Sequence, residues 1–330
     1  MISGDALAAW FEDRNARGRS AAAVERFGRA FRERPEFATL AAELDDARGL
    51  GAGPVLAAAA RYLADEAAVE AALAAMIGAA RDDPFFRPPL RTPMSEIHTG
   101  LILFDHPALT IFVAVMSPDS LAAKRTFRDG AASISFGGQQ AIYRFLRSGG
   151  ATLSFWQAPE LGAGFVGDPD LRCRLAGRRA IADGETVPLD GRREAFVIEH
   201  AVSDLVYLQA LTPIGAAPVM AEFDSATLAF VGASSTDEIG SRVGTMVSLL
   251  RAMDRTDAAP LFAEALRTAH FHGRWHVMRE FLALDADRAL PYLRNMAVCD
   301  PHPEVRAAAA QTLALFFPPS PVREELPCHA

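Results

Sequence analysis

Hydrophobic residues recur at helical spacing through the first part of the chain. An Ala-rich stretch over residues 55–80 carries apolar residues at three- and four-residue steps, as does the segment around Trp10. The proline-rich run Pro84–Pro89 cannot lie inside a helix and therefore predicts a boundary. We expect a helical region over residues 1–90, either a hairpin that mediates dimerisation or a layer that covers a sheet.

The pattern changes to that of β-strands between residues 96 and 234. Short runs rich in β-branched and aromatic residues are separated by turn signals, without helical periods between them. Three pairs of runs are predicted as hairpins: residues 98–104 with 109–116, residues 144–147 with 151–156, and residues 185–189 with 193–199. The dipeptide Asp190-Gly191 in the third pair is a strong turn signal. Strands at this spacing predict an antiparallel sandwich or barrel.

A helical period returns at Ile239 and continues to Phe317. The first helix carries one apolar stripe, formed by Val243, Met246, Val247, Leu250 and Met253. Further helices are predicted over residues 258–269, 276–284, 289–298 and 304–317. We expect these helices to form pairs that bury their apolar faces against the next pair.

The segment Asp300–Ala310 reads Asp-Pro-His-Pro-Glu-Val-Arg followed by four alanines, and it resembles a HEAT repeat. HEAT repeats commonly join two helices by an Asp-Pro-type turn and open the second helix with Val-Arg and small residues. An approximate echo stands earlier, at residues 275–282. The resemblance covers about the last quarter of the chain, and it implies a surface with a groove for a peptide or protein partner.

The segment Asp183–Phe196 is similar to the second cupin motif, in which a strand leads through a glycine turn to a metal-binding histidine. Matched residue by residue, Glu194 stands where that histidine belongs. The first cupin motif supplies a His-x-His pair and a glutamate upstream, yet the sequence has no histidine between His106 and His200. The resemblance therefore implies a jelly-roll shape and counts against the usual cupin metal.

A different metal site is an alternative. Glu96 and His98 share one face of a predicted strand, His106 lies in the adjoining turn, and Glu199 and His200 end a later strand. Two histidines with one carboxylate suit a non-haem iron site. On this alternative, the chain is a cupin-type oxygenase or isomerase that holds iron or another divalent metal through His98, His106 and Glu199.

The densest histidine cluster consists of His270, His272 and His276. On a single helix His272 and His276 share a face at i, i+4, as two zinc ligands do. However, Gly273 interrupts the run and the His-Glu-x-x-His motif is missing from it. We therefore interpret these histidines as polar contacts between neighbouring helices.

Other catalytic signals in the sequence are incomplete. The string Gly162-x-Gly164-x-x-Gly167 lacks the preceding strand and following helix of a dinucleotide site, so we expect a loop there. The only lysine, Lys124, would have to carry any Schiff-base chemistry, and we expect it in a loop over residues 119–130. We assign no catalytic residue.

Composition narrows the class of partner. A net charge of -8 over 330 residues argues against binding to nucleic acid, which requires a basic face. Three widely separated cysteines suit a reducing compartment. Neither a secretory signal nor an apolar run of membrane-spanning length is recognised. We expect a cytoplasmic protein without nucleic-acid or membrane partners.

Together these patterns predict an α+β chain. Its expected parts are N-terminal helices over residues 1–90, a cupin-like antiparallel sandwich or jelly roll over 91–236, HEAT-like helical repeats over 237–318 and a flexible tail over 319–330. We expect a non-enzymatic binding or accessory protein without a cofactor, which senses a small molecule or assists a partner protein. A metal-dependent enzyme and a structural homodimer are the alternatives. The candidate ligand contacts are Tyr143, Phe155, Trp156, Glu194, His200, Tyr207 and Gln209.

Overall fold

The structure is a computed structural model, and it describes residue 8 and residues 10–92, 99–127, 133–162 and 164–317. The chain divides into two compact units. Unit 1 comprises Met1–Glu160, Pro169–Ala217 and Ala221–Gly232, and unit 2 comprises Leu161–Asp168, Pro218–Met220 and Ala233–Ala330. The predicted flexible tail over residues 319–330 lies outside the described residues, and so does His98.

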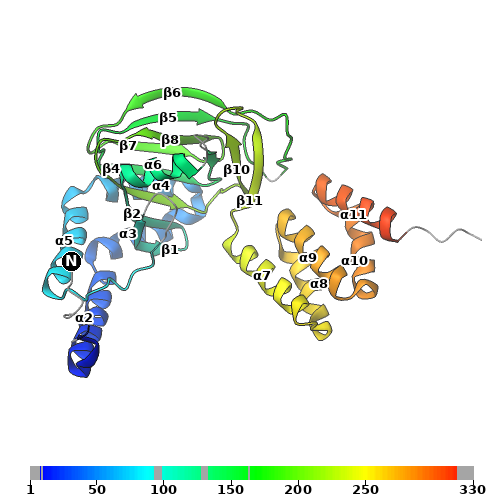
Figure 1. The fold of residues 1–330 in the computed structure, drawn as a ribbon, viewed down its shortest axis with the longest axis horizontal. Helices are drawn as coiled ribbons and strands as arrows, with labels where there is room; N and C mark the ends of the chain where they lie inside the picture. Colours follow the sequence, from blue (N-terminus) through cyan, green and yellow to red (C-terminus); the bar gives the residue numbers. More distant parts are fainter. Residues whose placement is uncertain (1–7, 9, 93–98, 128–132, 163, 318–330) are drawn as a thin grey trace, which may run out of the picture. The chain divides into compact units, whose positions relative to one another are not determined.

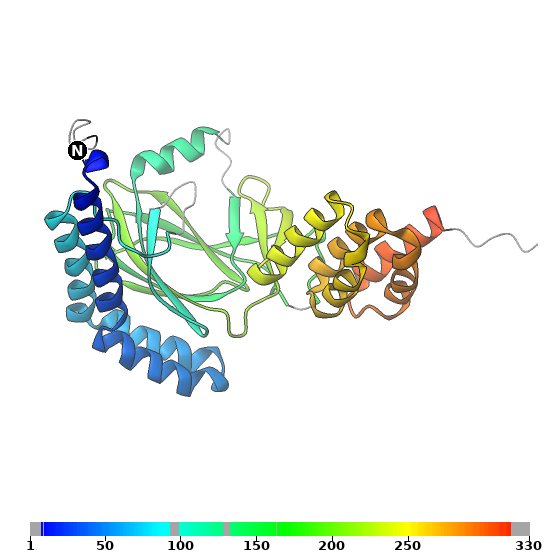
Figure 2. The ribbon, with the colours of Figure 1, turned by 90° about the horizontal axis from the view of Figure 1, so that it is seen from below.

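The N-terminal region is helical, as predicted. Its elements are α2 (Arg14–Arg32), α3 (Pro35–Ala47), the short 3-10 helix η1 (Arg48–Leu50), α4 (Ala52–Ala64) and α5 (Glu66–Asp82). Two of these helices begin at a carboxylate: Asp13 accepts hydrogen bonds from backbone amides of α2, and Asp65 does so in α5. The helices lie beside one face of a β-sheet (Figures 1 and 2), which is the arrangement of a covering layer.

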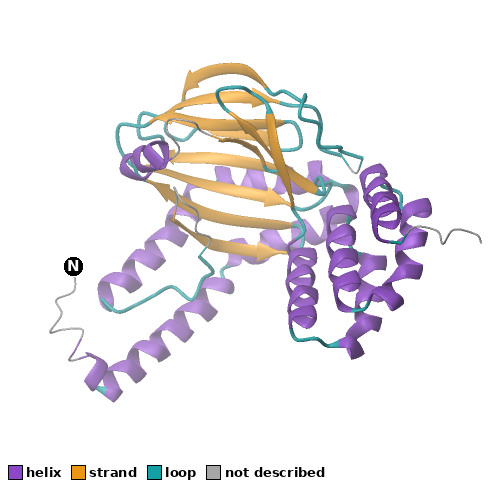
Figure 3. Ribbon diagram, turned by 45° about the vertical axis from the view of Figure 1, so that its right-hand side comes forward, coloured by secondary structure: helices purple, strands orange, loops and turns teal. Residues whose placement is uncertain are grey.

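The strands form three sheets with antiparallel pairing (Figure 3). The five-stranded sheet has the order β1 (Thr99–His106), β2 (Leu109–Met116), β9 (Leu205–Thr212), β4 (Gln140–Arg147) and β7 (Thr186–Asp190). A second sheet has the order β6 (Arg174–Ala180), β5 (Thr152–Gln157) and β8 (Glu194–His200). A third has the order β11 (Phe230–Ser235), β10 (Val219–Asp224) and β3 (Ser133–Phe136).

One of the three predicted hairpins is confirmed and two are wrong. β1 and β2 pair directly, with His106 opposite Leu109. In contrast, β4 pairs with β7 and β9, whereas β5 pairs with β6 and β8. The chain likewise changes sheet between β7 and β8. Both predictions failed because a turn signal marks a change of direction but does not specify which sheet the next strand joins.

Two glycines make the corner between β4 and β5. Gly149 and Gly150 have φ values of 57° and 66°, a region that L side chains rarely adopt. A Cβ atom on Gly149 would also lie 2.3 Å from the carbonyl oxygen of Ser203. The corner therefore needs glycine both for its backbone conformation and for the close approach of a second chain segment.

The five-stranded sheet carries apolar side chains on both faces. In β2, Ile111 and Val113 pack with the N-terminal helices, whereas Phe112 points to the opposite side. In β9, Leu208 packs with the helices and Tyr207 points to the opposite side. We call this second core, which also takes residues from β5 and β8, the sandwich interior.

The segment expected to be a loop over residues 119–130 begins as a helix. α6 (Pro118–Phe127) follows β2, and its first turn is capped because the Ser117 hydroxyl accepts a hydrogen bond from the amide of Ser120 at 3.1 Å. Pro118 at the helix start suits the fixed φ of proline. The expectation missed this Ser-Pro start signal.

Unit 2 contains the five predicted C-terminal helices. They are α7 (Glu238–Ala252), α8 (Ala259–Thr268), α9 (Phe271–Leu284), α10 (Ala286–Cys299) and α11 (Pro303–Phe316), with a short 3-10 helix η2 (Thr256–Ala258) before α8. α9 begins at Phe271 rather than at His276, so Gly273 lies within the helix instead of interrupting it. None of the described helices is both long and apolar enough to cross a membrane.

A buried ion pair fixes the turn between α10 and α11. The Asp300 carboxylate accepts hydrogen bonds from Nε and Nη2 of Arg274 at 2.7 and 2.8 Å, and from the amide of His302 at 2.8 Å. Burial alone would raise the pKa of Asp300, but the hydrogen bonds and the Arg274 charge outweigh it and the net pKa is lowered. The Asp-Pro turn of the repeat is thus bound directly to α9.

The imidazole of His302 attaches a distant loop to this turn. Its ring stacks on Phe271 with 3.8 Å between centroids, and its Nε2 lies 3.2 Å from the carbonyl oxygen of Phe165. Phe165 belongs to the segment Leu161–Asp168, which is part of unit 2 although the strands before and after it, β5 and β6, belong to unit 1. This segment contains the glycine string predicted to be a loop, and its described residues form neither strand nor helix.

We expect Asp300→Ala to destabilise unit 2 by about 3 kcal/mol, because it leaves the Arg274 guanidinium without its partner. This loss of stability is at the low end for a buried ion pair, because the Arg274 side chain is still 17% exposed to solvent. Urea unfolding followed by Trp275 fluorescence, with Trp10 and Trp156 replaced by Phe, measures unit 2 alone. Asp287→Asn, at an exposed carboxylate of α10, is the control and should change little.

The same pair gives a pH dependence with a defined sign. Because the folded pKa of Asp300 is lowered, its contribution is complete above the ordinary aspartate pKa of 3.8 and is lost as pH falls below that value. Asp300→Asn should remove this part of the acid sensitivity. An unchanged acid profile in Asp300→Asn would contradict the assignment.

Candidate functional site

Aromatic side chains pack against one another in the sandwich interior, the part of a jelly roll that can hold a ligand. The Tyr143 ring lies 4.8 Å from that of Phe196 and 5.9 Å from that of Tyr207, measured between centroids. Phe145, which is fully buried, lies 5.9 Å from Tyr207. Phe112 joins the same cluster. Of the predicted ligand contacts, Tyr143 and Tyr207 are therefore core residues.

One hydrogen bond satisfies the polar groups of this interior. Gln209 Nε2 donates to the Tyr143 hydroxyl at 2.7 Å, and the two residues are opposite each other on the paired strands β9 and β4. Burial raises the pKa of Tyr143 well above its usual range and raises that of Tyr207 to about 12. Both phenols therefore keep their protons near neutral pH.

The remaining predicted ligand contacts lie on β5 and β8. Phe155 is half-buried and packs against the sandwich interior, with its ring centroid 6.3 Å from that of Phe196. The guanidinium of Arg179 lies 5.0 Å from the centroid of the Phe155 ring. Trp156 is buried and donates from Nε1 to the Ser154 hydroxyl at 3.0 Å. Each therefore has its own partner within the sheet.

Glu194 and His200 stand at opposite ends of β8. The Glu194 carboxylate accepts a hydrogen bond from the amide of Asp190 at 3.1 Å, across the turn between β7 and β8. His200 is exposed at the other end of the strand. A strand of this length separates its ends by roughly 20 Å, so one small ligand does not contact both.

The predicted metal ligands have separate partners. His106 Nε2 lies 3.4 Å from a carboxylate oxygen of Asp45 in α3. Glu199 lies 3.9 Å from Arg178 of β6. The third ligand, His98, lies outside the described residues. Within the described part of the chain, no three His, Cys, Asp or Glu residues are grouped so that they could hold a metal ion.

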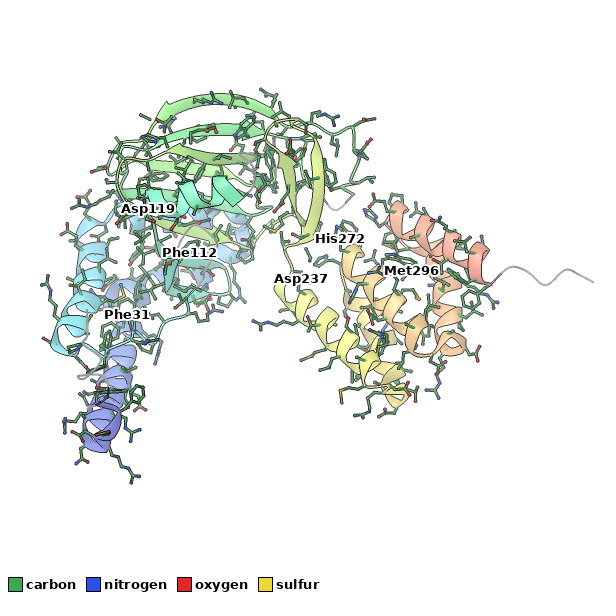
Figure 4. All side chains as sticks on the ribbon, viewed as in Figure 1. Phe31, Phe112, Asp119, Asp237, His272 and Met296 are labelled. Atoms are coloured by element: carbon green, nitrogen blue, oxygen red, sulfur yellow. The ribbon has the colours of Figure 1, made fainter. Side chains whose placement is uncertain are left out.

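An open groove lies between α7 and α9 in unit 2. It has a volume of about 470 Å³, within the usual range of small-ligand sites. Figure 4 labels Asp237 and His272, which stand at the starts of α7 and α9 on its two sides. Its lining residues are Ser235, Asp237, Gly240, Ser241, Gly244, Thr245, Ser248, Ala269, His270, His272, Gly273 and His276. We call this feature the α7–α9 groove.

Three histidines contribute to the α7–α9 groove, each in a different setting. His276 Nε2 lies 3.0 Å from the Ser248 hydroxyl and 3.3 Å from the carbonyl oxygen of Gly244, so the interpretation as an inter-helix polar contact is confirmed for it. His270 Nε2 lies 3.9 Å from the Asp237 carboxylate. Burial lowers the pKa of His272, so its imidazole is neutral at neutral pH.

The sequence reasoning found these histidines but missed the side of the groove that α7 supplies. Small residues at every fourth position, Gly240, Gly244 and Ser248, line one side of the helix. This spacing is readable in the sequence. It was overlooked because the apolar stripe of the same helix dominates the pattern.

We expect Tyr143→Phe to destabilise unit 1 by about 1–3 kcal/mol, because the buried Gln209 amide loses its acceptor. The double variant Tyr143→Phe with Gln209→Leu should recover most of this loss, since both polar partners are then replaced by apolar groups. Urea unfolding of the two variants and the parent measures the difference. A double variant no more stable than Tyr143→Phe alone would show that the pair is not the source of the loss.

One segment of the chain matches the model of a known protein family. The HEAT repeat model matches residues 289–318, which contain most of α10 and α11. The curated proteins include no match to the chain. The match to the HEAT model covers the turn at Asp300, on which the resemblance in the sequence was based.

Among the solved structures that match part of this chain, three cover about two fifths of it. Ectoine synthase from P. lautus is 9% identical over 37% of this chain and 68% of that one, with a TM-score of 0.23. DMSP lyase from Ruegeria pomeroyi DSS-3 is 12% identical over 44% and 62%, with a TM-score of 0.25. A cupin domain from Bordetella pertussis Tohama I is 10% identical over 36% and 98%, with a TM-score of 0.21. These solved structures include a cupin domain, and the family-model match places a HEAT repeat in the C-terminal region of this chain.

Proposed function

We propose that this chain is a non-enzymatic binding protein that receives an extended segment of a partner protein in the α7–α9 groove. The observation that carries the proposal is the groove itself, an open space of about 470 Å³ along two helices of a unit that carries a HEAT repeat. HEAT-type repeats present elongated surfaces that suit such segments. The cupin-like fold is compatible with either an enzyme or a binding protein, so the fold alone does not decide between them.

The lining of the groove favours an uncharged peptide segment. Among the described lining residues the carboxylate is that of Asp237, which caps α7 and accepts a hydrogen bond from the amide of Gly240 at 2.9 Å. The neutral imidazole of His272 adds no charge at neutral pH. Backbone groups of the partner would find polar atoms in the hydroxyls and imidazoles of the lining.

The hydroxyl groups of α7 keep acceptor capacity for such a segment. Ser241 donates to the carbonyl oxygen of Asp237 at 2.9 Å, and Thr245 donates to that of Ser241 at 3.1 Å. Each hydroxyl oxygen still has lone pairs that accept from a partner's backbone N–H groups. The groove therefore offers acceptors along α7 opposite the imidazoles of α9.

The packing of the sandwich interior is consistent with a non-enzymatic role for the cupin-like region. Aromatic side chains around Tyr143 pack against one another between the sheets. His106 and Glu199, which the alternative reading uses for a divalent metal, contact residues of different elements. The region then acts as a scaffold, and binding takes place on its outside or on unit 2.

We expect the purified full chain to contain no stoichiometric divalent metal. Added Fe²⁺, Mn²⁺ or Ni²⁺ should leave its melting temperature unchanged, because a ligand raises the melting temperature only if it binds the folded state. Elemental analysis and thermal melts make the measurement. Stoichiometric metal that disappears in His98→Ala or His106→Ala would overturn the proposal in favour of a metal-dependent enzyme.

The groove is tested with a pair of matched tryptophan substitutions on α7. Ser241→Trp fills the groove, whereas Met246→Trp places the same side chain at an exposed position that is not part of the lining. Peptides selected on the parent protein from a phage-displayed random library should lose roughly tenfold or more in affinity for Ser241→Trp, because the site is blocked. Their affinity for Met246→Trp should not change.

Fluorescence polarisation with the synthetic peptides measures both affinities. The proposal fails if the library yields no binding peptide. It also fails if the selected peptides bind Ser241→Trp as well as they bind the parent. Circular dichroism of both variants checks that unit 2 remains helical.

A further inference from the structure

A second hollow lies in unit 1 and is lined by three arginines. It has a volume of about 420 Å³ and stands where β5 ends and β6 begins. Its lining residues are Gln157, Ala158, Pro159, Arg172, Arg174 and Arg193. We call it the arginine hollow. It is independent of the α7–α9 groove, because every one of these residues belongs to unit 1.

Strand pairing brings the arginines together from separate parts of the chain. Gln157 at the end of β5 is opposite Arg174 of β6 on one side and Glu194 of β8 on the other. Arg193 immediately precedes β8, and its carbonyl oxygen accepts a hydrogen bond from the amide of Ala158 at 3.0 Å. Arg172 and Arg174 are two residues apart on extended backbone, so their side chains leave the same face.

The backbone that carries Arg172 is fixed on its far side. Arg172 forms an isolated β-bridge with Ala229. The carbonyl oxygen of Leu171 accepts from the amide of Phe230 at 3.0 Å, and the amide of Cys173 donates to the carbonyl oxygen of Leu228 at 3.1 Å. A ligand therefore meets arginines whose main chain is already ordered, which lowers the entropy cost of binding.

The three arginines differ in the charge of the groups that they contact. Arg172 donates to the carbonyl oxygens of Pro169 and Leu171 at 2.6 and 2.9 Å, and Arg174 donates to the side-chain oxygen of Gln157. These acceptors are neutral, so they orient the two guanidinium groups without cancelling their charge. Arg193 instead pairs with the carboxylates of Glu160 and Asp190.

The carboxylates of Glu160, Asp190 and Glu194 near the hollow contact groups other than Arg172 and Arg174. Glu160 and Asp190 are shared by Arg193 and by the adjacent Arg192. Asp170, two residues before Arg172, is exposed and is not part of the lining. Two oriented guanidinium groups therefore face the hollow with neutral partners, in a chain whose net charge is -8.

We propose that the arginine hollow binds the phosphate group of a small phosphorylated molecule. Guanidinium forks match the tetrahedral oxygens of phosphate, and each fork donates two hydrogen bonds to them. Arg172 and Arg174 hold the phosphate, and Arg193 lines the hollow while it stays paired with Glu160 and Asp190. A phosphate group alone fills only a small part of 420 Å³, so the space beside Ala158 and Pro159 receives the organic part of the ligand.

Isothermal titration calorimetry of the full chain at low ionic strength tests the proposal, with glycerol phosphate, inorganic phosphate, glycerol and succinate as probes. We expect binding of the two phosphates, with weaker affinity at higher salt because the arginines are exposed. Glycerol should not bind, and succinate should bind more weakly than either phosphate.

Substitutions locate the site. Arg172→Gln and Arg174→Gln should each weaken phosphate binding by roughly tenfold or more, because each removes one charged fork. Arg172→Lys should lose part of the affinity, since it keeps the charge but not the fork. Arg178→Gln, at an exposed arginine of β6 outside the hollow, is the matched control and should bind like the parent.

The proposal is overturned if neither phosphate binds at concentrations up to about 10 mM. It is also overturned if succinate binds more tightly than both phosphates, or if Arg178→Gln loses as much affinity as Arg172→Gln. Because the groove belongs to the other unit, none of these results bears on the proposed partner binding there.

Discussion

Apolar packing on both faces of the central strands is the constraint on which unit 1 depends. β2 and β9 supply Ile111 and Leu208 to the core with the N-terminal helices, and Phe112 and Tyr207 to the sandwich interior. A slip of one residue in their pairing would exchange the two sets, so both cores fix the same register. Aromatic residues complete the second core, between the five-stranded sheet and strands β5 and β8.

Much of the fold follows from local sequence signals. The helical periods, the first hairpin and the Asp-Pro turn at Asp300 correctly predicted helices, strands and a repeat in their order along the chain. The hairpins predicted around Gly149 and Asp190 are wrong, because in each case the next strand joins another sheet. A turn signal does not specify whether the next strand pairs with the preceding one. That choice depends on contacts between residues distant in the sequence.

The candidate sites show the same division between local and non-local information. The histidines of α9 were evident from the sequence, whereas the bond between Tyr143 and Gln209 depends on the pairing of β4 with β9. The arginine hollow was not predicted at all. Its arginines come from two stretches of chain, and they meet only because β5 pairs with both β6 and β8. Residue type alone did not distinguish these arginines from the many others in the chain.

The contact between His302 and Phe165 has a consequence for dividing the protein. A C-terminal fragment beginning near residue 233 would include all the helices of unit 2 but not the segment Leu161–Asp168. Such a fragment would expose the His302 ring, which is 3% exposed in the whole chain, and would remove the carbonyl oxygen that its Nε2 contacts. The helices of the repeat region follow one another in the sequence, but their packing also uses a segment from far earlier in the chain. The region is therefore best studied within the intact polypeptide.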